Sequence, residues 1–252
     1  MTLRRWAMAV AVLVCLAAAG PQAADQAPNA RVLFIGNSLT FANNLPAMIE
    51  AVTAQAGFKG RIRCQAVALP NSGLQEHWHD GRALSALRNG TRWTHVVLQQ
   101  GPTSMPDSRR ILREFAGKFA FEARSIGAKV VIFSPWTPRD RLEFMDAVLE
   151  SHHLAAEDVK GILVPVGEGW RAALRVDPSL PLYGRDDFHP SPAGSYVAAL
   201  MFFERLAGRS PVGLPNPATS KDKALSDVNV DATQLKVLQH AAAEANAKVR
   251  RP

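Results

Sequence analysis

The sequence contains little cysteine, and we do not expect the two that are present to form a pair in the folded chain. One of them, Cys15, lies in residues 1–24, where Arg4 and Arg5 precede an apolar run that ends in small residues. This pattern is typical of a cleaved export signal. Cleavage would leave Cys64 alone, which excludes an internal disulfide. We therefore expect an exported protein, periplasmic or extracellular, that depends on its hydrophobic core for stability.

The sequence also lacks a long hydrophobic run and a concentrated block of one charge. The apolar part of residues 1–24 is shorter than the roughly 20 residues that a membrane-spanning helix needs, so we expect no stable membrane insertion after cleavage. An uncleaved anchor is the alternative. Without residues 1–24 the chain has 27 basic and 22 acidic residues, a net charge of +5. Because the basic residues are scattered in pairs and singles, we expect no nucleic acid partner.

Neither a phosphate-binding loop nor a metal site is indicated. A single glycine precedes Ser38, and no Gly-Lys-Ser follows it, so the stretch is not a glycine-rich phosphate cradle. The segment "EHWHD" at 76–80 is rich in metal-ligand types. On a helix, however, His77 and His79 point about 200° apart and cannot chelate together. We expect no metal and no cofactor.

Five short apolar runs alternate with helical patterns along residues 25–252. This alternation predicts one α/β domain with a parallel sheet, because parallel strands need helical crossovers. The runs are at 32–35, 62–69, 94–100, 129–135 and 161–167. Helices are expected at 44–57, at 108–127 with Ser108 as cap, at 192–207 with Ser191 as cap, and at 231–249 within a C-terminal segment 226–252.

Ligands of open α/β sheets bind beyond the carboxyl ends of the strands, which is where Ser38 follows the first run. A serine hydroxyl needs an imidazole to accept its proton and a carboxylate to orient that imidazole. The segment "YGRDDFHP" supplies Asp186 and His189 three residues apart. Taken alone, "GNS" is ordinary turn chemistry. Together with Asp186 and His189, Ser38 is predicted to be a nucleophile.

These segments resemble the SGNH/GDSL hydrolases. "FIGNSLT" resembles the nucleophile block, with Asn37 replacing the usual aspartate, and "DDFHP" resembles the closing block. "ALPNSG" resembles the second block, whose glycine, here Gly73, would give an N–H to the oxyanion beside the N–H of Ser38. The resemblance implies a serine esterase with a flavodoxin-like three-layer sandwich around a central, mainly parallel five-stranded sheet.

The third block departs from the usual pattern, because "LQQGPTS" has no asparagine. It is similar to the branch, including carbohydrate acetylesterases, in which a glutamine before a glycine serves as the donor. Gln100 matches that Gln-Gly pair, whereas Gln99 follows the strand more closely, and both stay candidates. Trp78 and Trp136 follow strands and would either flank the cleft as platforms for a sugar ring or cover the edge of the sheet.

The pattern predicts hydrolysis of small acyl esters, with acetyl groups on carbohydrate or another small molecule as the expected substrates. A lipase or thioesterase with the same chemistry is one alternative. A catalytically silent domain that binds glycan or a cell-envelope partner is another, although a binding domain needs no Asp–His pair.

Overall fold

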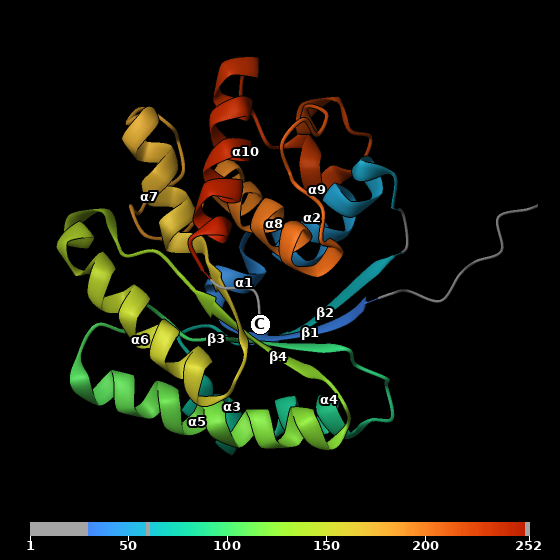
Figure 1. Cartoon of the computed structure of the whole chain (residues 1–252), viewed down its shortest axis with the longest axis vertical. Helices are drawn as coiled ribbons and strands as arrows, with labels where there is room; N and C mark the ends of the chain where they lie inside the picture. Colours follow the sequence, from blue (N-terminus) through green and yellow to red (C-terminus); the bar gives the residue numbers. More distant parts are fainter. Residues whose placement is uncertain (1–29, 59–60, 250–252) are drawn as a thin grey trace, which may run out of the picture.

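A central sheet of five parallel strands organises the chain in the computed structural model, which describes residues 30–58 and 61–249 (Figure 1). The predicted export segment lies outside these residues. The strand order is β2-β1-β3-β4-β5, so β1 is paired on both sides. In that pairing Phe34 is opposite Ala66 on one side and Val97 on the other. The strands are β1 (Ala30–Gly36), β2 (Ile62–Ala68), β3 (His95–Gln99), β4 (Lys129–Ser134) and β5 (Ile162–Pro165).

Helices cover both faces of the sheet, which confirms the three-layer α/β fold (Figure 1). Successive residues of β1 enter different cores: Phe34 packs in the core on one side, and Leu33 and Ile35 pack in the core on the other. This double burial explains the nearly continuous apolar strand sequences. One layer contains α2 (Leu45–Thr53), α7 (Val166–Val176), α8 (Pro192–Ala207) and α10 (Ala232–Ala247). The other layer contains α3 (Leu74–Asp80), α4 (Arg82–Arg88), α5 (Pro106–Ser125) and α6 (Met145–Asp158). Two further helices are short, α1 (Ser38–Phe41) and α9 (Lys223–Ser226).

Of the two predicted serine caps, Ser191 is confirmed and Ser108 is the exception. Ser191 caps α8 by accepting the N–H of Gly194, and Gly208 ends the helix in a left-handed conformation. The exception is α5, which begins at Pro106 rather than after Ser108. The Ser108 hydroxyl donates to the carbonyl of Met105 instead of capping the helix. Across the described ranges, no helix has the length and apolarity needed to span a bilayer.

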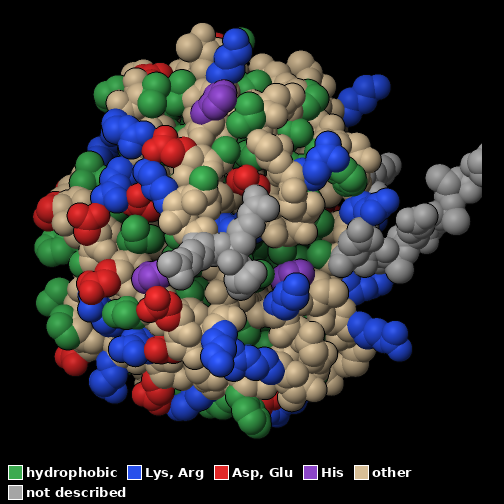
Figure 2. All heavy atoms as spheres, in the orientation of Figure 1, with side chains coloured by type: hydrophobic (Ala, Val, Ile, Leu, Met, Phe, Trp, Pro, Cys, Tyr) green, Lys and Arg blue, Asp and Glu red, His purple; other side chains and the backbone are tan. Residues whose placement is uncertain are grey.

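Charged side chains are mixed over the face shown in Figure 2, where acidic groups lie among the basic ones. Several form ion pairs between helices, such as Arg88 with Glu122 at 2.7 Å. One histidine, His152, is fully buried, and its Nδ1 lies 2.8 Å from the carbonyl of Val148. Burial lowers the pKa of His152 to about 4.

Candidate active site

Strand β1 ends at Gly36, a position where a side chain does not fit. A Cβ on Gly36 would lie 2.5 Å from both Gln99 Oε1 and Thr40 Oγ1. The strand therefore passes close against the end of β3 and turns directly into α1, whose first residue is Ser38. The sequence signal "GNS" thus marks a tight strand-to-helix turn that presents the half-buried Ser38 at the sheet edge.

Asn37 organises this turn and connects it to the loop after β2. Its Oδ1 accepts the N–H of Leu39 at 3.1 Å, which caps α1, and its Nδ2 donates to the carbonyl of Ser72 at 3.0 Å. An aspartate could not make the second bond, so the asparagine in place of the family's aspartate has a structural consequence. Because Ser38 is the first residue of the helix, its own N–H has no acceptor within the helix.

Asp186, His189 and Ser38 form a continuous hydrogen-bonded row. His189 Nε2 lies 2.9 Å from Ser38 Oγ, and His189 Nδ1 lies 2.5 Å from Asp186 Oδ2. Asp186 Oδ1 also accepts the backbone N–H groups of Phe188 and His189. These bonds lower the pKa of Asp186 to about 2, and the bond from the His189 ring has the largest effect. The carboxylate favours a proton on Nδ1, which leaves Nε2 free to accept the serine proton.

The loop that carries His189 is held to the nucleophile loop by Asn43, a residue with no role in the sequence analysis. Asn43 Nδ2 donates to the carbonyl of Pro190 and to the hydroxyl of Ser195, both at 2.9 Å. Asn43 has a left-handed backbone with φ of 51°, which asparagine tolerates better than most residues. The pair "NN" before Pro46 signals a turn, but nothing in the sequence indicates its distant partners.

The predicted oxyanion donor Gly73 begins α3, and its N–H already has an acceptor. Glu76 Oε2 accepts this N–H at 2.8 Å, as part of the helix cap. The helix is anchored at the sheet edge by His77, whose buried Nε2 lies 2.6 Å from the carbonyl of Gly36. Gly73 is therefore near the end of β1, but Glu76 occupies its donor.

Gln99 serves the turn rather than an open site. Its buried Oε1 accepts the N–H of Asn37 at 2.8 Å and the hydroxyl of Thr40 at 2.9 Å, while its Nε2 donates to the carbonyl of Gln100. These bonds use both ends of the Gln99 amide. The structure therefore disfavours Gln99 as the oxyanion donor.

Gln100 lies beside Gly73, as its candidate role requires. A Cβ on Gly73 would lie 3.0 Å from Gln100 Oε1, and that oxygen accepts the N–H of Leu74 at 3.3 Å. The amide nitrogen of Gln100 donates to Thr103 Oγ1 at 3.2 Å and to the carbonyl of Ser108 at 3.4 Å. Of the two glutamines, Gln100 is thus the one next to Gly73, with its donor nitrogen directed to the following loop.

The two tryptophans have packing roles. Trp136, considered as a sugar platform, is fully buried and stacks on Trp170 at a centroid distance of 3.9 Å. Its Nε1 donates to the carbonyl of Phe188, so it supports the backbone next to His189. Trp78 is half-buried and packs edge-on against Phe119 of α5, 5.2 Å between centroids. Both tryptophans therefore cover the sheet rather than offer a free ring face.

The histidines of "EHWHD" diverge as expected. His77 is buried against β1, whereas the exposed His79 ring packs on Phe115 of α5. Residues 30–58 and 61–249 contain no group of three or more His, Cys, Asp or Glu side chains placed to hold a metal ion.

Comparison with solved structures gives the same fold. A protein of Slackia heliotrinireducens assigned to the SGNH hydrolases is 27% identical, with a TM-score of 0.59 over 69% of this chain and 97% of its own. A DUF4886 family protein of Bacteroides uniformis is 17% identical, with a TM-score of 0.70 over 87% of this chain and 95% of its own. An acetylxylan esterase of Geobacillus stearothermophilus is 16% identical, with a TM-score of 0.55 over 73% and 97%.

No protein-family model and no curated protein matches the sequence. The evidence for the family is thus the shared fold, the 27% identity to an SGNH protein over most of that protein's length, and the order of the sequence blocks. The chain therefore has the fold of the SGNH/GDSL ester hydrolases and resembles them in the order of its sequence blocks.

Proposed function

We propose that this protein is an exported serine esterase in which His189 deprotonates Ser38. The Ser38 oxygen attacks the ester carbonyl, the alcohol leaves with the proton from His189, and an acyl-enzyme remains. Water, activated by the same imidazole, then releases the acid. The observation that carries the proposal is the row of contacts from Asp186 through His189 to Ser38. Export is supported by the signal-like residues 1–24.

We further propose short acyl groups, with carbohydrate acetates among the first substrates to test. The Gln-Gly pair at Gln100 supports this choice, and one protein of similar fold is an acetylxylan esterase. Lipase or thioesterase activity is the alternative within the same chemistry. A series of 4-nitrophenyl esters of increasing acyl length distinguishes them: we expect kcat/KM to fall as the chain is lengthened beyond acetate.

The engagement of Gly73 and Gln100 by neighbouring groups favours a second candidate, a catalytically silent binding domain. One experiment decides between the two. Wild type and Ser38→Ala are incubated with a fluorophosphonate probe and with 4-nitrophenyl acetate. We expect labelling and turnover in wild type alone, whereas equal behaviour of both proteins would exclude Ser38 as the nucleophile and favour the silent domain.

A further inference from the structure

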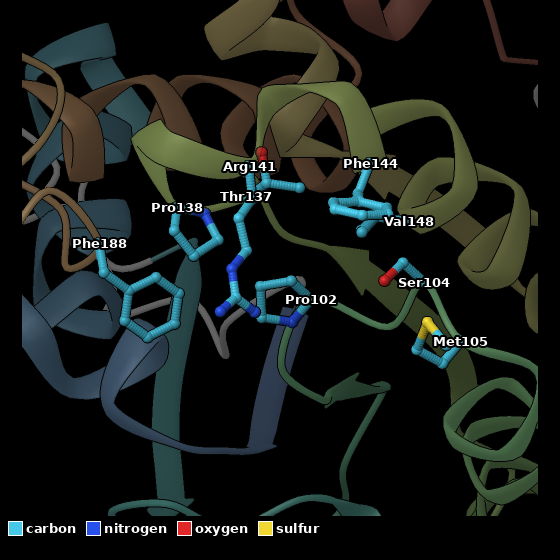
Figure 3. Close-up of a pocket in the computed structure, with 9 residues that line it drawn as sticks. All are labelled: Pro102, Ser104, Met105, Thr137, Pro138, Arg141, Phe144, Val148 and Phe188. Carbon is cyan, nitrogen blue, oxygen red and sulfur yellow. The ribbon is translucent and has the colours of Figure 1, made fainter.

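A small pocket lies beside the Ser38–His189 pair, at the carboxyl ends of β3 and β4. Its volume is about 320 Å³, at the lower end of the range for small-molecule sites, which is about 300–1,000 Å³. Its walls are mainly apolar, with one charged residue, as Figure 3 shows. The lining residues are Pro102, Ser104, Met105, Thr137, Pro138, Arg141, Phe144, Val148 and Phe188.

Two walls of the pocket adjoin the catalytic groups along the chain. Phe188 directly precedes His189, and their rings are 5.1 Å apart. Pro102 follows Gln100 by two residues. The Phe188 wall of the pocket thus lies close to the His189 ring. Because His189 must give its proton to the departing oxygen, the alcohol half of an ester leaves on this side.

The charged residue in the pocket is Arg141, and its chemistry differs from that of the nearby Arg139. Arg139 pairs with Asp187 at 2.8 Å and lies over the ring of Tyr183. Arg141 is exposed to solvent and has no ion pair with any other residue in the described part of the chain. Figure 3 shows its side chain extending across the pocket toward Pro102. A guanidinium in a mainly apolar pocket is complementary to a carboxylate, which it can bind through two parallel hydrogen bonds.

We propose that this pocket binds the alcohol half of the ester through a carboxylate held by Arg141, with an apolar ring or short chain against Phe144 and Phe188. This inference rests on the proposed esterase function and narrows it. The substrate class becomes short acyl esters of hydroxy compounds that carry a carboxylate. A neutral sugar acetate would leave Arg141 without a partner.

The test compares two acetyl esters that share a ring, 4-acetoxybenzoate and its methyl ester. We expect Arg141→Gln to lower kcat/KM for 4-acetoxybenzoate about tenfold, because the substitution removes one charge-assisted contact that is partly exposed to solvent. The value of kcat/KM for the methyl ester should change less than about twofold. Arg141→Lys should recover part of the loss. The difference in leaving-group acidity between the esters cancels in the ratio of variant to wild type.

Arg92→Gln is the matched control, because it removes one exposed positive charge next to β3 at the opposite edge of the sheet. Arg92→Gln should leave the ratio of kcat/KM between the two esters unchanged. Equal effects of Arg141→Gln on both esters, or none on either, would overturn the inference while Ser38-dependent turnover upheld the esterase.

Product binding gives a readout that does not need catalysis. Calorimetry with Ser38→Ala measures the affinity for 4-hydroxybenzoate and for its methyl ester. We expect Arg141→Gln in this background to weaken only the binding of the carboxylate. If the carboxylate binds selectively but Ser38 proves inactive, the pocket assignment holds and the esterase fails. If both ligands bind equally, the pocket assignment fails by itself.

Discussion

The two halves of the site differ in how complete they are. On the proton-transfer side, Asp186, His189 and Ser38 already contact one another at hydrogen-bond distance. On the oxyanion side, Gly73 donates to Glu76 and the Gln100 amide donates to Thr103. The Ser38 N–H, at the start of α1, is the donor that helix geometry leaves available.

This difference has a physical origin. Donors at the edge of the sheet must have acceptors when no oxyanion is present, because an unpaired donor is costly once it is buried. The Ser–His pair, in contrast, satisfies its own groups. In the proposed mechanism, substrate can therefore use the proton relay as it stands, whereas the oxyanion has to displace Glu76 or turn Gln100.

The largest effects should follow from substitutions on the proton-transfer side, which we call the preassembled half because Asp186, His189 and Ser38 are already in contact. His189→Ala and Ser38→Ala should each lower kcat about 10⁶-fold, and Asp186→Asn about 10⁴-fold. Because these groups act as a unit, Ser38→Ala combined with His189→Ala should lose no more than either alone. Steady-state kinetics with 4-nitrophenyl acetate measures this, and additive losses would contradict a shared role.

The two glutamines should separate catalysis from stability. Gln100→Ala should lower kcat about hundredfold, as expected for the loss of an oxyanion donor, with a loss of about 1 kcal/mol in unfolding free energy. Gln99→Ala should lose about 3 kcal/mol of unfolding free energy, because it leaves buried partners unpaired and creates a cavity. Urea denaturation and kinetics on both variants check this. The reverse assignment would follow if Gln99→Ala impaired kcat in a protein of wild-type stability.

Asn43 should affect the alignment of the preassembled half. Asn43→Ala removes the bond to Pro190 in the His189 loop and the bond to Ser195 in α8. We expect kcat to fall about tenfold with KM unchanged, since a small misplacement of reacting groups is costly. Asn43→Gly is the control, because glycine accepts the left-handed backbone but lacks the amide. If Asn43→Gly retained full kcat, backbone strain rather than the amide would explain the effect.

Glu76 occupies the Gly73 donor on the oxyanion side, so its removal should change kcat in the opposite direction. Glu76→Ala frees the Gly73 N–H and removes a negative charge from near the oxyanion, so we expect kcat to rise about threefold. The same change removes half of a helix cap and should lower the unfolding free energy by about 1 kcal/mol. A fall in kcat would mean that Glu76 positions Gly73 rather than competing for its donor.

The smallest effect concerns pH. Asp186 has a folded-state pKa of about 2, below its usual value of 3.8, so its contribution to stability is present above pH 3.8 and is lost as the pH falls through 2. The difference in unfolding free energy between wild type and Asp186→Asn should be constant from pH 7 to 4 and shrink below it. Denaturant titrations at these pH values measure the difference. Shrinkage that began well above pH 4 would argue against the strong Asp186–His189 bond.

Much of this protein could be predicted from local sequence. The apolar runs and the turn residues that bound them predicted the five strands to within a residue or two, because buried parallel strands need apolar sequence between turns. The cap at Ser191 was predictable for the same local reason. The grouping of Ser38, Asp186 and His189 required their positions at strand ends and in a short loop, together with the family resemblance. That resemblance also predicted the three-layer sandwich.

The sequence alone determined which residue types are available for chemistry and in what order they occur, since those follow from pattern and spacing. Only the tertiary structure decided which of them are free to act. It buried Trp136, committed Gln99 to the turn after β1, connected Asn43 to Pro190 and left Arg141 in a pocket without an acidic partner among the described residues. Each outcome depends on contacts between segments far apart in the chain, and hydrogen bonds of that kind have no local sequence signal.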